Sequence, residues 1–385
     1  MKRNISDLLD RYPAEDVELG GNTPYSQTRI KEITMKNIHT ETKSSKKGFK
    51  PAHLLAAAAV AAAFTVSALA AGRLLGGELF GDVFSRGDGS LTPGQVETID
   101  RLVRTFEGQD GAAPAAVTDN GASITPLAAL ADENVYYLRL RVEAPEGTAL
   151  PDLDWERDGA CYQLFGPETA DHLTLEPAEG AYPADTFGYQ LDFRPLPDSE
   201  PNDNVKEFVA QFTNLSDGGI ALNDGVSKVL TVRGLWTQDS DKGYTPIFTG
   251  TFAFDIGLNF QSQLVELETE GLTWSTRAED ELRGEVYDVT NTVAEMSLSP
   301  LSLSYRYTTT LPKDNSWIGA GLGPVELILK DGTEIPCVHG HDTDVGDSRT
   351  GTRELEGFIV FDQPLDLSQV DHLQYGDNKI PVNAG

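Results

Sequence analysis

The spacing of apolar residues changes along the chain and predicts three kinds of element. Residues 52–71 (AHLLAAAAVAAAFTVSALAA) carry no formal charge, and a helix of that length just spans the hydrocarbon layer of a membrane. Residues 91–108 (LTPGQVETIDRLVRTFEG) place apolar side chains at helical spacing behind a Thr-Pro start, which predicts a capped helix. From Asn120 onward apolar residues recur at every second position, which predicts β-strands.

The alternation of apolar and polar residues is clearest in three segments. It is seen at Leu138, Leu140 and Val142, at Phe252, Phe254, Ile256, Leu258 and Phe260, and at Leu301, Leu303, Tyr305 and Tyr307. The segment ELILKDGTEIPC predicts a hairpin in which Asp331-Gly332 forms a tight primed turn. We therefore expect a mainly β fold with two antiparallel β-sandwich-like domains, residues 119–276 and 277–385.

The first 51 residues contain two short amphipathic patterns. The apolar positions of these patterns are Ile5, Leu8, Leu9 and Tyr12 in the first, and Ile30, Ile33 and Ile38 in the second. Helices this short become stable only by packing on something else, so one interpretation is a partner-binding tail. The other interpretation is a disordered tether whose second half is a basic helix at the membrane surface.

Charge fixes the orientation of the apolar segment. Residues 1–51 carry a net charge of +3, whereas the remaining 334 residues carry −33. By the positive-inside rule, the N-terminus is cytoplasmic and residues 72–385 lie outside. As a polyanion, the outer region should repel nucleic acid and favour divalent cations or basic peptides.

These patterns predict a single-pass protein of the cell membrane. We expect a cytoplasmic tail (1–51), a transmembrane helix (52–71), a juxtamembrane helix with a linker (72–118), and then the two extracytoplasmic β domains. A cleavable signal is the alternative, because Ala68-Leu69-Ala70 has the small-x-small pattern of a cleavage site. A retained span is favoured, because the residues before it are far more numerous than in a usual signal.

The sequence shows no catalytic signature, so we expect no enzyme activity, no metal and no cofactor. It has no Gly-x-Ser-x-Gly, phosphate-loop or dinucleotide motif. The segment from His339 to Asp347 is rich in His and Asp, but a solvated loop explains it better than a metal site. Asp239-Ser-Asp241 resembles the start of a calcium loop, whose twelfth position is Gly250 instead of the required Glu.

Cysteine and tryptophan residues leave alternatives open. Cys161 and Cys337 are the only cysteines; they either form a disulfide that links the two domains or remain as two buried thiols. The four tryptophans could line a sugar-binding groove, although such residues are more often core anchors of a β-sandwich. They are Trp155, Trp236, Trp274 and Trp317.

Four segments resemble known families. The basic tail and span followed by TDNGASITPLAALADENVYYLRLRVEAPEG, with residues 119–147 most alike, are similar to proteins of Gram-positive bacteria that contain the juxtamembrane domain of unknown function 4179. The segment GTFAFDIGL fits the end of that domain. LSPLSLSYRY and IVFDQPLDLS resemble the immunoglobulin-like domain that often follows it.

The resemblance implies a regulatory function. Many such proteins are thought to act as anti-sigma factors, so the tail would hold an extracytoplasmic-function sigma factor while the outer domains sense an unidentified ligand or act as an anchor. The tail has no Cys and its only His is His39, so it departs from the zinc-containing anti-sigma factors. The alternative function is a cell-surface binding or structural protein without a cytoplasmic partner.

Overall fold

The structure is a computed structural model. It describes residues 76–85, 91–106, 115–164, 173–177, 189–198, 200, 203–214, 227–240, 242–260, 263–280, 285–310, 322–337, 340–344 and 352–383. The predicted span 52–71 and the tail positions Ile5, Leu8, Leu9, Tyr12, Ile30, Ile33 and Ile38 lie outside these residues. Within the described ranges, no helix has both the length and the apolar character needed to cross a membrane.

Two helices precede the strands. Helix α4 spans Gly76–Phe84, and α5 spans Pro93–Leu102 with Pro93 in the first turn. The predicted cap is confirmed: the Thr92 hydroxyl accepts from the backbone N–H of Gln95, whose side chain accepts in turn from the N–H of Thr92. The helix ends at Leu102, although the helical spacing was predicted to continue to Phe106, because Arg104–Thr105 form strand β1, which pairs with β3.

The first set of strands forms two antiparallel sheets around one core. One sheet has the order β1-β3-β4-β8-β7, with β2 also pairing with β3; the other has the order β10-β9-β5, with β6 also pairing with β9. The predicted alternation at Leu138, Leu140 and Val142 is confirmed, because all three are buried in a core that residues of both sheets share. The bounds are β2 Val117–Asp119, β3 Ala122–Ala131, β4 Val135–Glu143, β5 Ala160–Gln163, β6 Leu173–Pro177, β7 Tyr189–Pro195, β8 Val205–Asn214, β9 Lys228–Asp239 and β10 Gly243–Asp255, with the short helix α6 at Trp155–Asp158.

The second set of strands has its own core. One sheet has the order β11-β13-β14-β18-β17, with β12 also pairing with β13, and the other has the order β16-β15-β19-β20. The expected boundary at 276/277 falls inside β12, so this set begins earlier, at Val265 in β11. The bounds are β11 Val265–Glu266, β12 Thr273–Asp280, β13 Glu285–Leu298, β14 Ser302–Thr310, β15 Val325–Leu329, β16 Glu334–Pro336, β17 Gly340–Asp344, β18 Thr352–Val360, the 3-10 helix η5 Leu367–Gln369, β19 Val370–Tyr375 and β20 Asn378–Pro381.

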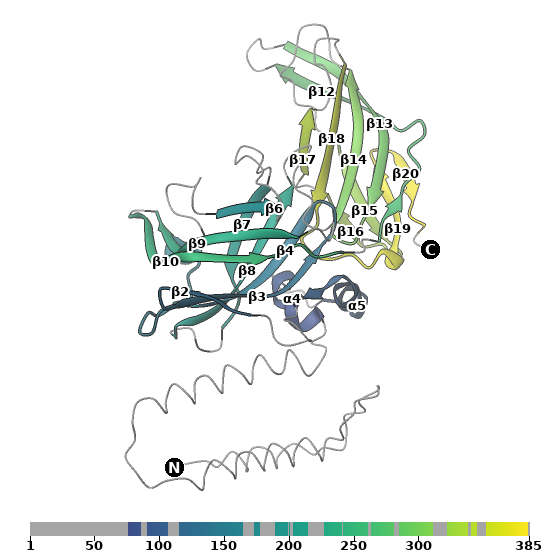
Figure 1. Ribbon diagram of the computed structural model, residues 1–385. Helices are drawn as coiled ribbons and strands as arrows, with labels where there is room; N and C mark the ends of the chain where they lie inside the picture. The colour runs from purple at the N-terminus through teal and green to yellow at the C-terminus, as the bar shows by residue number, and fades with distance from the viewer. Residues whose placement is uncertain are drawn as a thin grey trace, which may run out of the picture. The chain divides into compact units, whose positions relative to one another are not determined.

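One hairpin turn differs from expectation, and another was not predicted. The hairpin of β15 and β16 is present, but only Gly332 has a positive φ, of 88°, so Asp331-Gly332 is not a primed turn. A primed turn instead joins β2 to β3 at Asn120-Gly121, where φ is 51° and 80°. Figure 1 shows α4 and α5 together and next to β3.

Candidate functional site

The turn between β3 and β4 carries a buried acid that receives four hydrogen bonds. The Asp132 carboxylate accepts from the backbone N–H groups of Asn134 (2.8 Å) and Val135 (2.9 Å). It also accepts from the hydroxyls of Ser299 and Ser302, the latter at 2.6 Å. The two serines belong to the turn between β13 and β14, so Asp132 joins the first set of strands to the second. We call the turn 132–134 the acidic turn and the turn 299–302 the serine turn.

Burial opposes the charge of this acid. Asp132 is 3% exposed, and burial raises its pKa above the usual 3.8, while the four hydrogen bonds act in the opposite direction without cancelling the effect. Burial also raises the pKa of Glu133, which accepts from Ser304 at 2.8 Å. The Asn134 amide donates to the hydroxyls of Ser302 and Ser304, both at 2.7 Å. Polar side chains of both turns are therefore bonded to one another across the contact.

Side chains from both sets of strands hold helix α4 through its backbone carbonyls. From the first set, Arg139 donates to the carbonyl of Leu79 and Arg194 donates to that of Val83 at 3.0 Å. From the second set, Gln363 donates to the carbonyl of Phe84 at 3.1 Å. The last carbonyls of a helix have no partner within the helix and carry partial negative charge, so Arg194 and Gln363, which donate to the carbonyls of Val83 and Phe84, cap and stabilise α4. Arg139 adds a hydrogen bond nearer the middle of the helix.

Helix α5 contacts the same segment of the second set. The Gln95 amide donates to the side-chain oxygen of Gln363 at 3.3 Å. A Cβ added to Gly94 would lie 2.1 Å from a carboxylate oxygen of Asp366, so glycine permits this close approach. The other Asp366 oxygen caps η5 by accepting from the N–H of Ser368. The loop 361–366 therefore touches both helices.

The serine turn and the loop 361–366 are bonded to each other. The N–H of Phe361 donates to the carbonyl of Leu301, and the N–H of Leu365 donates to the carbonyl of Pro300. We call the acidic turn, the serine turn, the loop 361–366, α4 and α5 together the junction. An apolar cluster fills it, with Leu79, Phe80, Val83, Phe84, Ile99, Leu102, Ala128, Leu130, Val135, Tyr137, Leu196, Val209 and Leu301 buried.

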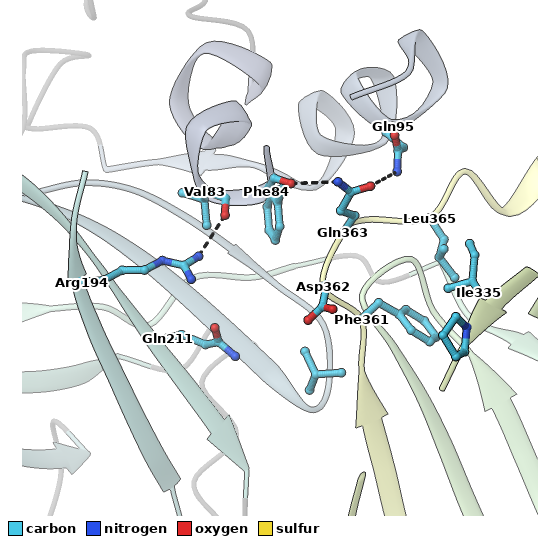
Figure 2. A pocket seen from close by; sticks show the side chains of 12 residues that line it. Val83, Phe84, Gln95, Arg194, Gln211, Ile335, Phe361, Asp362, Gln363 and Leu365 are labelled. Carbon is cyan, nitrogen blue, oxygen red and sulfur yellow. Dashed lines mark hydrogen bonds between the residues drawn. The ribbon is translucent and has the colours of Figure 1, made fainter. Parts of the chain in front are cut away.

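A pocket of about 550 Å³ opens in the junction (Figure 2). Its walls come from α4, α5, β7 and β8, and from β16, the end of β18 and the loop 361–366. The lining combines apolar side chains with the amides of Gln95, Gln211 and Gln363 and the charged groups of Arg194 and Asp362. A molecule in this pocket would touch both sets of strands and both helices at once.

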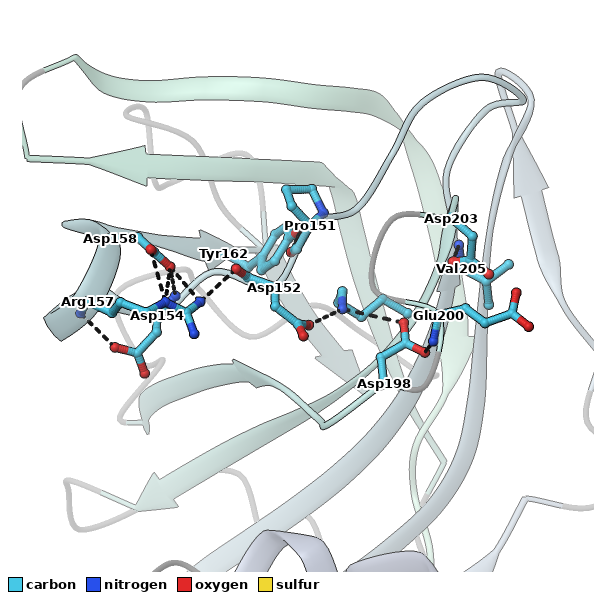
Figure 3. A network of polar contacts seen from close by, with 11 residues as sticks. Pro151, Asp152, Asp154, Arg157, Asp158, Tyr162, Asp198, Glu200, Asp203 and Val205 are labelled. Carbon is cyan, nitrogen blue, oxygen red and sulfur yellow. Dashed lines mark hydrogen bonds and ion pairs between the residues drawn. The ribbon is translucent and has the colours of Figure 1, made fainter.

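A second polar network lies away from the junction (Figure 3). The Lys206 side chain is fully buried, and its ammonium lies 2.5 Å from a carboxylate oxygen of Asp152 and 3.4 Å from one of Asp198. Tyr162 donates to the carbonyl of Pro151 beside it. Two carboxylates satisfy the buried cation, and they fasten the segments before β5 and before β8 to the start of β8. We assign this network a structural role.

The sequence-level candidates do not gather into a site. No group of metal-ligating side chains occurs in the described part of the chain. His339, Asp347 and Asp241 lie outside that part, whereas Asp342 accepts hydrogen bonds from Tyr305 and Tyr307. Both cysteines are free thiols, Cys161 half-buried and Cys337 buried. Trp236 is buried, Trp274 is partly buried and packs against the second core, and Trp155 is 48% exposed. Trp317 lies outside the described ranges.

The residues of the junction are ones that the hydrophobic pattern does not identify. In a single sequence, turns such as ADEN and LSPLS are expected to be solvent-exposed. Hydrophobic periodicity indicates helices and strands, but it does not indicate which turns contact each other. A single sequence also gives no signal that Asp132 contacts Ser299, because 167 positions separate the two residues.

No known protein family and no curated protein matches the chain. Among solved structures, one that is similar is the crystal structure of the conserved domain protein from Bacillus anthracis. It is 12% identical in sequence, with a TM-score of 0.39, and the match covers 71% of this chain and 76% of that one.

Proposed function

We propose that the chain is a single-pass membrane regulator of the anti-sigma-factor type. Its tail, residues 1–51, binds a sigma factor in the cytoplasm through Ile5, Leu8, Leu9, Tyr12, Ile30, Ile33 and Ile38. The span 52–71 crosses the membrane, and the two β domains outside sense a signal or anchor the protein. The proposal rests on the charge asymmetry, the two amphipathic patterns and the resemblance.

The single structural observation that favours sensing over anchoring is the position of α4. This helix begins at Gly76, shortly after the end of the proposed span at Ala71. Its carbonyls accept hydrogen bonds from Arg139 and Arg194 of the first set of strands and from Gln363 of the second. A rearrangement of the two sets would therefore change the contacts of the segment that leads into the membrane.

The test is the effect of the tail on transcription. Overproduction of residues 1–51 in the native cell should lower the activity of promoters that depend on one extracytoplasmic-function sigma factor. The same tail with Ile5→Asp, Leu8→Asp, Ile30→Asp and Ile33→Asp should have no effect, because both apolar faces are lost. Unchanged transcription with the native tail would favour the cell-surface binding or structural protein instead.

A further inference from the structure

The pocket of the junction has the size and position of a ligand site. Its volume of about 550 Å³ lies within the range of roughly 300–1,000 Å³ that is typical of small-molecule pockets. Such pockets occur preferentially where domains meet, and this one is lined by both sets of strands and by both helices.

The lining defines an amphipathic ligand. Phe84 and Phe361, both buried, supply apolar wall. Gln95, Gln211 and Gln363 each carry an amide that can donate and accept, which suits a ligand with amide groups of its own. Each amide already has a partner within the chain, because Gln95 donates to Gln363, Gln363 donates to the carbonyl of Phe84, and Gln211 donates to Thr213. The hydrogen-bonding capacity that remains on each amide is what it offers to a ligand.

The charges favour a cation. Arg194 is directed to the carbonyl of Val83 and lies 3.9 Å from a carboxylate oxygen of Asp192, so a neighbouring acid offsets its charge. Asp362, at the pocket, is exposed. Figure 2 shows its carboxylate on the side of the pocket that faces Arg194 and Gln211. The chain carries a net charge of −30, which raises the local concentration of cations and lowers that of anions.

We propose that the junction pocket binds a short amphipathic cation of the basic-peptide class. The ammonium or guanidinium of the ligand pairs with Asp362, its amide groups bond to the glutamines, and its apolar part lies against Phe84 and Phe361. Binding to the pocket does not depend on the proposed function. Only the consequence of binding rests on it: occupancy of the pocket is the signal that the outer domains sense.

The test uses the full-length protein in nanodiscs of uncharged lipid, with empty nanodiscs as the blank. The probes are acetyl-Leu-Lys-Leu-amide and its norleucine analogue, which lacks the charge. Binding is measured by titration calorimetry at about 0.15 M salt, which screens long-range electrostatic attraction. Asp362→Asn is compared with Asp377→Asn, which removes the same charge from another exposed position.

The lysine peptide should bind saturably at one site. Loss of a charge-assisted hydrogen bond should weaken binding about tenfold, both for the norleucine peptide and for Asp362→Asn, whereas Asp377→Asn should leave it nearly unchanged. If both aspartate variants weaken binding equally, the peptide is attracted by the overall negative charge of the chain and not by Asp362, and the inference is wrong. The absence of saturable binding would also overturn it. Because binding is measured without any sigma factor, its outcome is independent of the transcription experiment.

Discussion

The Ser302 hydroxyl donates a hydrogen bond of 2.6 Å to the Asp132 carboxylate, although 170 positions separate the two residues in sequence. Asp132 also accepts from two backbone N–H groups of its own turn, whereas the Ser299 and Ser302 hydroxyls reach it from the second set of strands. The serine turn is bonded through the backbone to the loop 361–366, which in turn holds the last carbonyl of α4. A continuous series of contacts therefore runs from Asp132 to Phe84.

The first prediction concerns the contact between the acidic turn and the serine turn. Asp132→Ala should lower the free energy of unfolding by about 3 kcal/mol, because it leaves two hydroxyls and two N–H groups without their acceptor. Ser302→Ala should cost about 1.5 kcal/mol, since it removes one donor from a buried carboxylate. Denaturant titration measures both, and the exposed Ser275→Ala is the control with little expected effect. A double variant whose loss equals the sum of the single losses would show that the two residues are not coupled.

The pH dependence follows from the raised pKa of Asp132. The folded chain holds the proton of this acid more tightly than the unfolded chain does, so the contribution of Asp132 to stability increases as the pH falls from neutrality toward 3.8. The side chain of Asp132→Asn does not titrate. Its amide N–H₂ faces hydrogen-bond donors, which lowers the free energy of unfolding by an amount that does not change with pH. The stability of the native chain relative to Asp132→Asn should thus rise as the pH is lowered from 7 to 4. A flat or falling difference would mean that burial does not raise this pKa.

The capping of α4 predicts a local effect on hydrogen exchange. Gln363→Ala removes the donor to the Phe84 carbonyl and the contact with Gln95. The amides of α4 should then exchange several-fold faster, while those of β13 and β14 keep their protection, because local opening depends on local contacts. Gln369→Ala, at an exposed position, serves as the control. Equal acceleration by both variants would remove the proposed role of Gln363.

The cysteines should be separate thiols of low reactivity. Burial raises the pKa of Cys337 to about 12 and also raises that of half-buried Cys161, and only the thiolate reacts readily. At pH 8 in the native state, iodoacetamide should label Cys161 slowly and Cys337 more slowly still, with both labelled after denaturation. The mass should not change on reduction. A gain of about 2 Da on reduction would reveal the disulfide that the sequence left open.

The sequence predicts the elements of this fold better than the contacts between them. Alternation identified β4 correctly because each inward side chain is apolar, and Thr92 and Pro93 located the start of α5. The end of α5 was predicted too late, since the pairing of Arg104 with β3 is not visible in helical spacing. Asp132, Arg139 and Gln363 act at the junction through partners far away in the chain, and a single sequence does not indicate such pairs.

The central claim, that the tail binds a sigma factor, is tested most directly by a pull-down from native cell extract with residues 1–51 as bait. The control bait carries Ile5→Asp, Leu8→Asp, Ile30→Asp and Ile33→Asp. We predict that the native tail recovers one extracytoplasmic-function sigma factor and that the control bait does not. If the two baits recover the same proteins, or the native tail recovers no sigma factor, the claim is contradicted and the tail is a membrane-targeting tether.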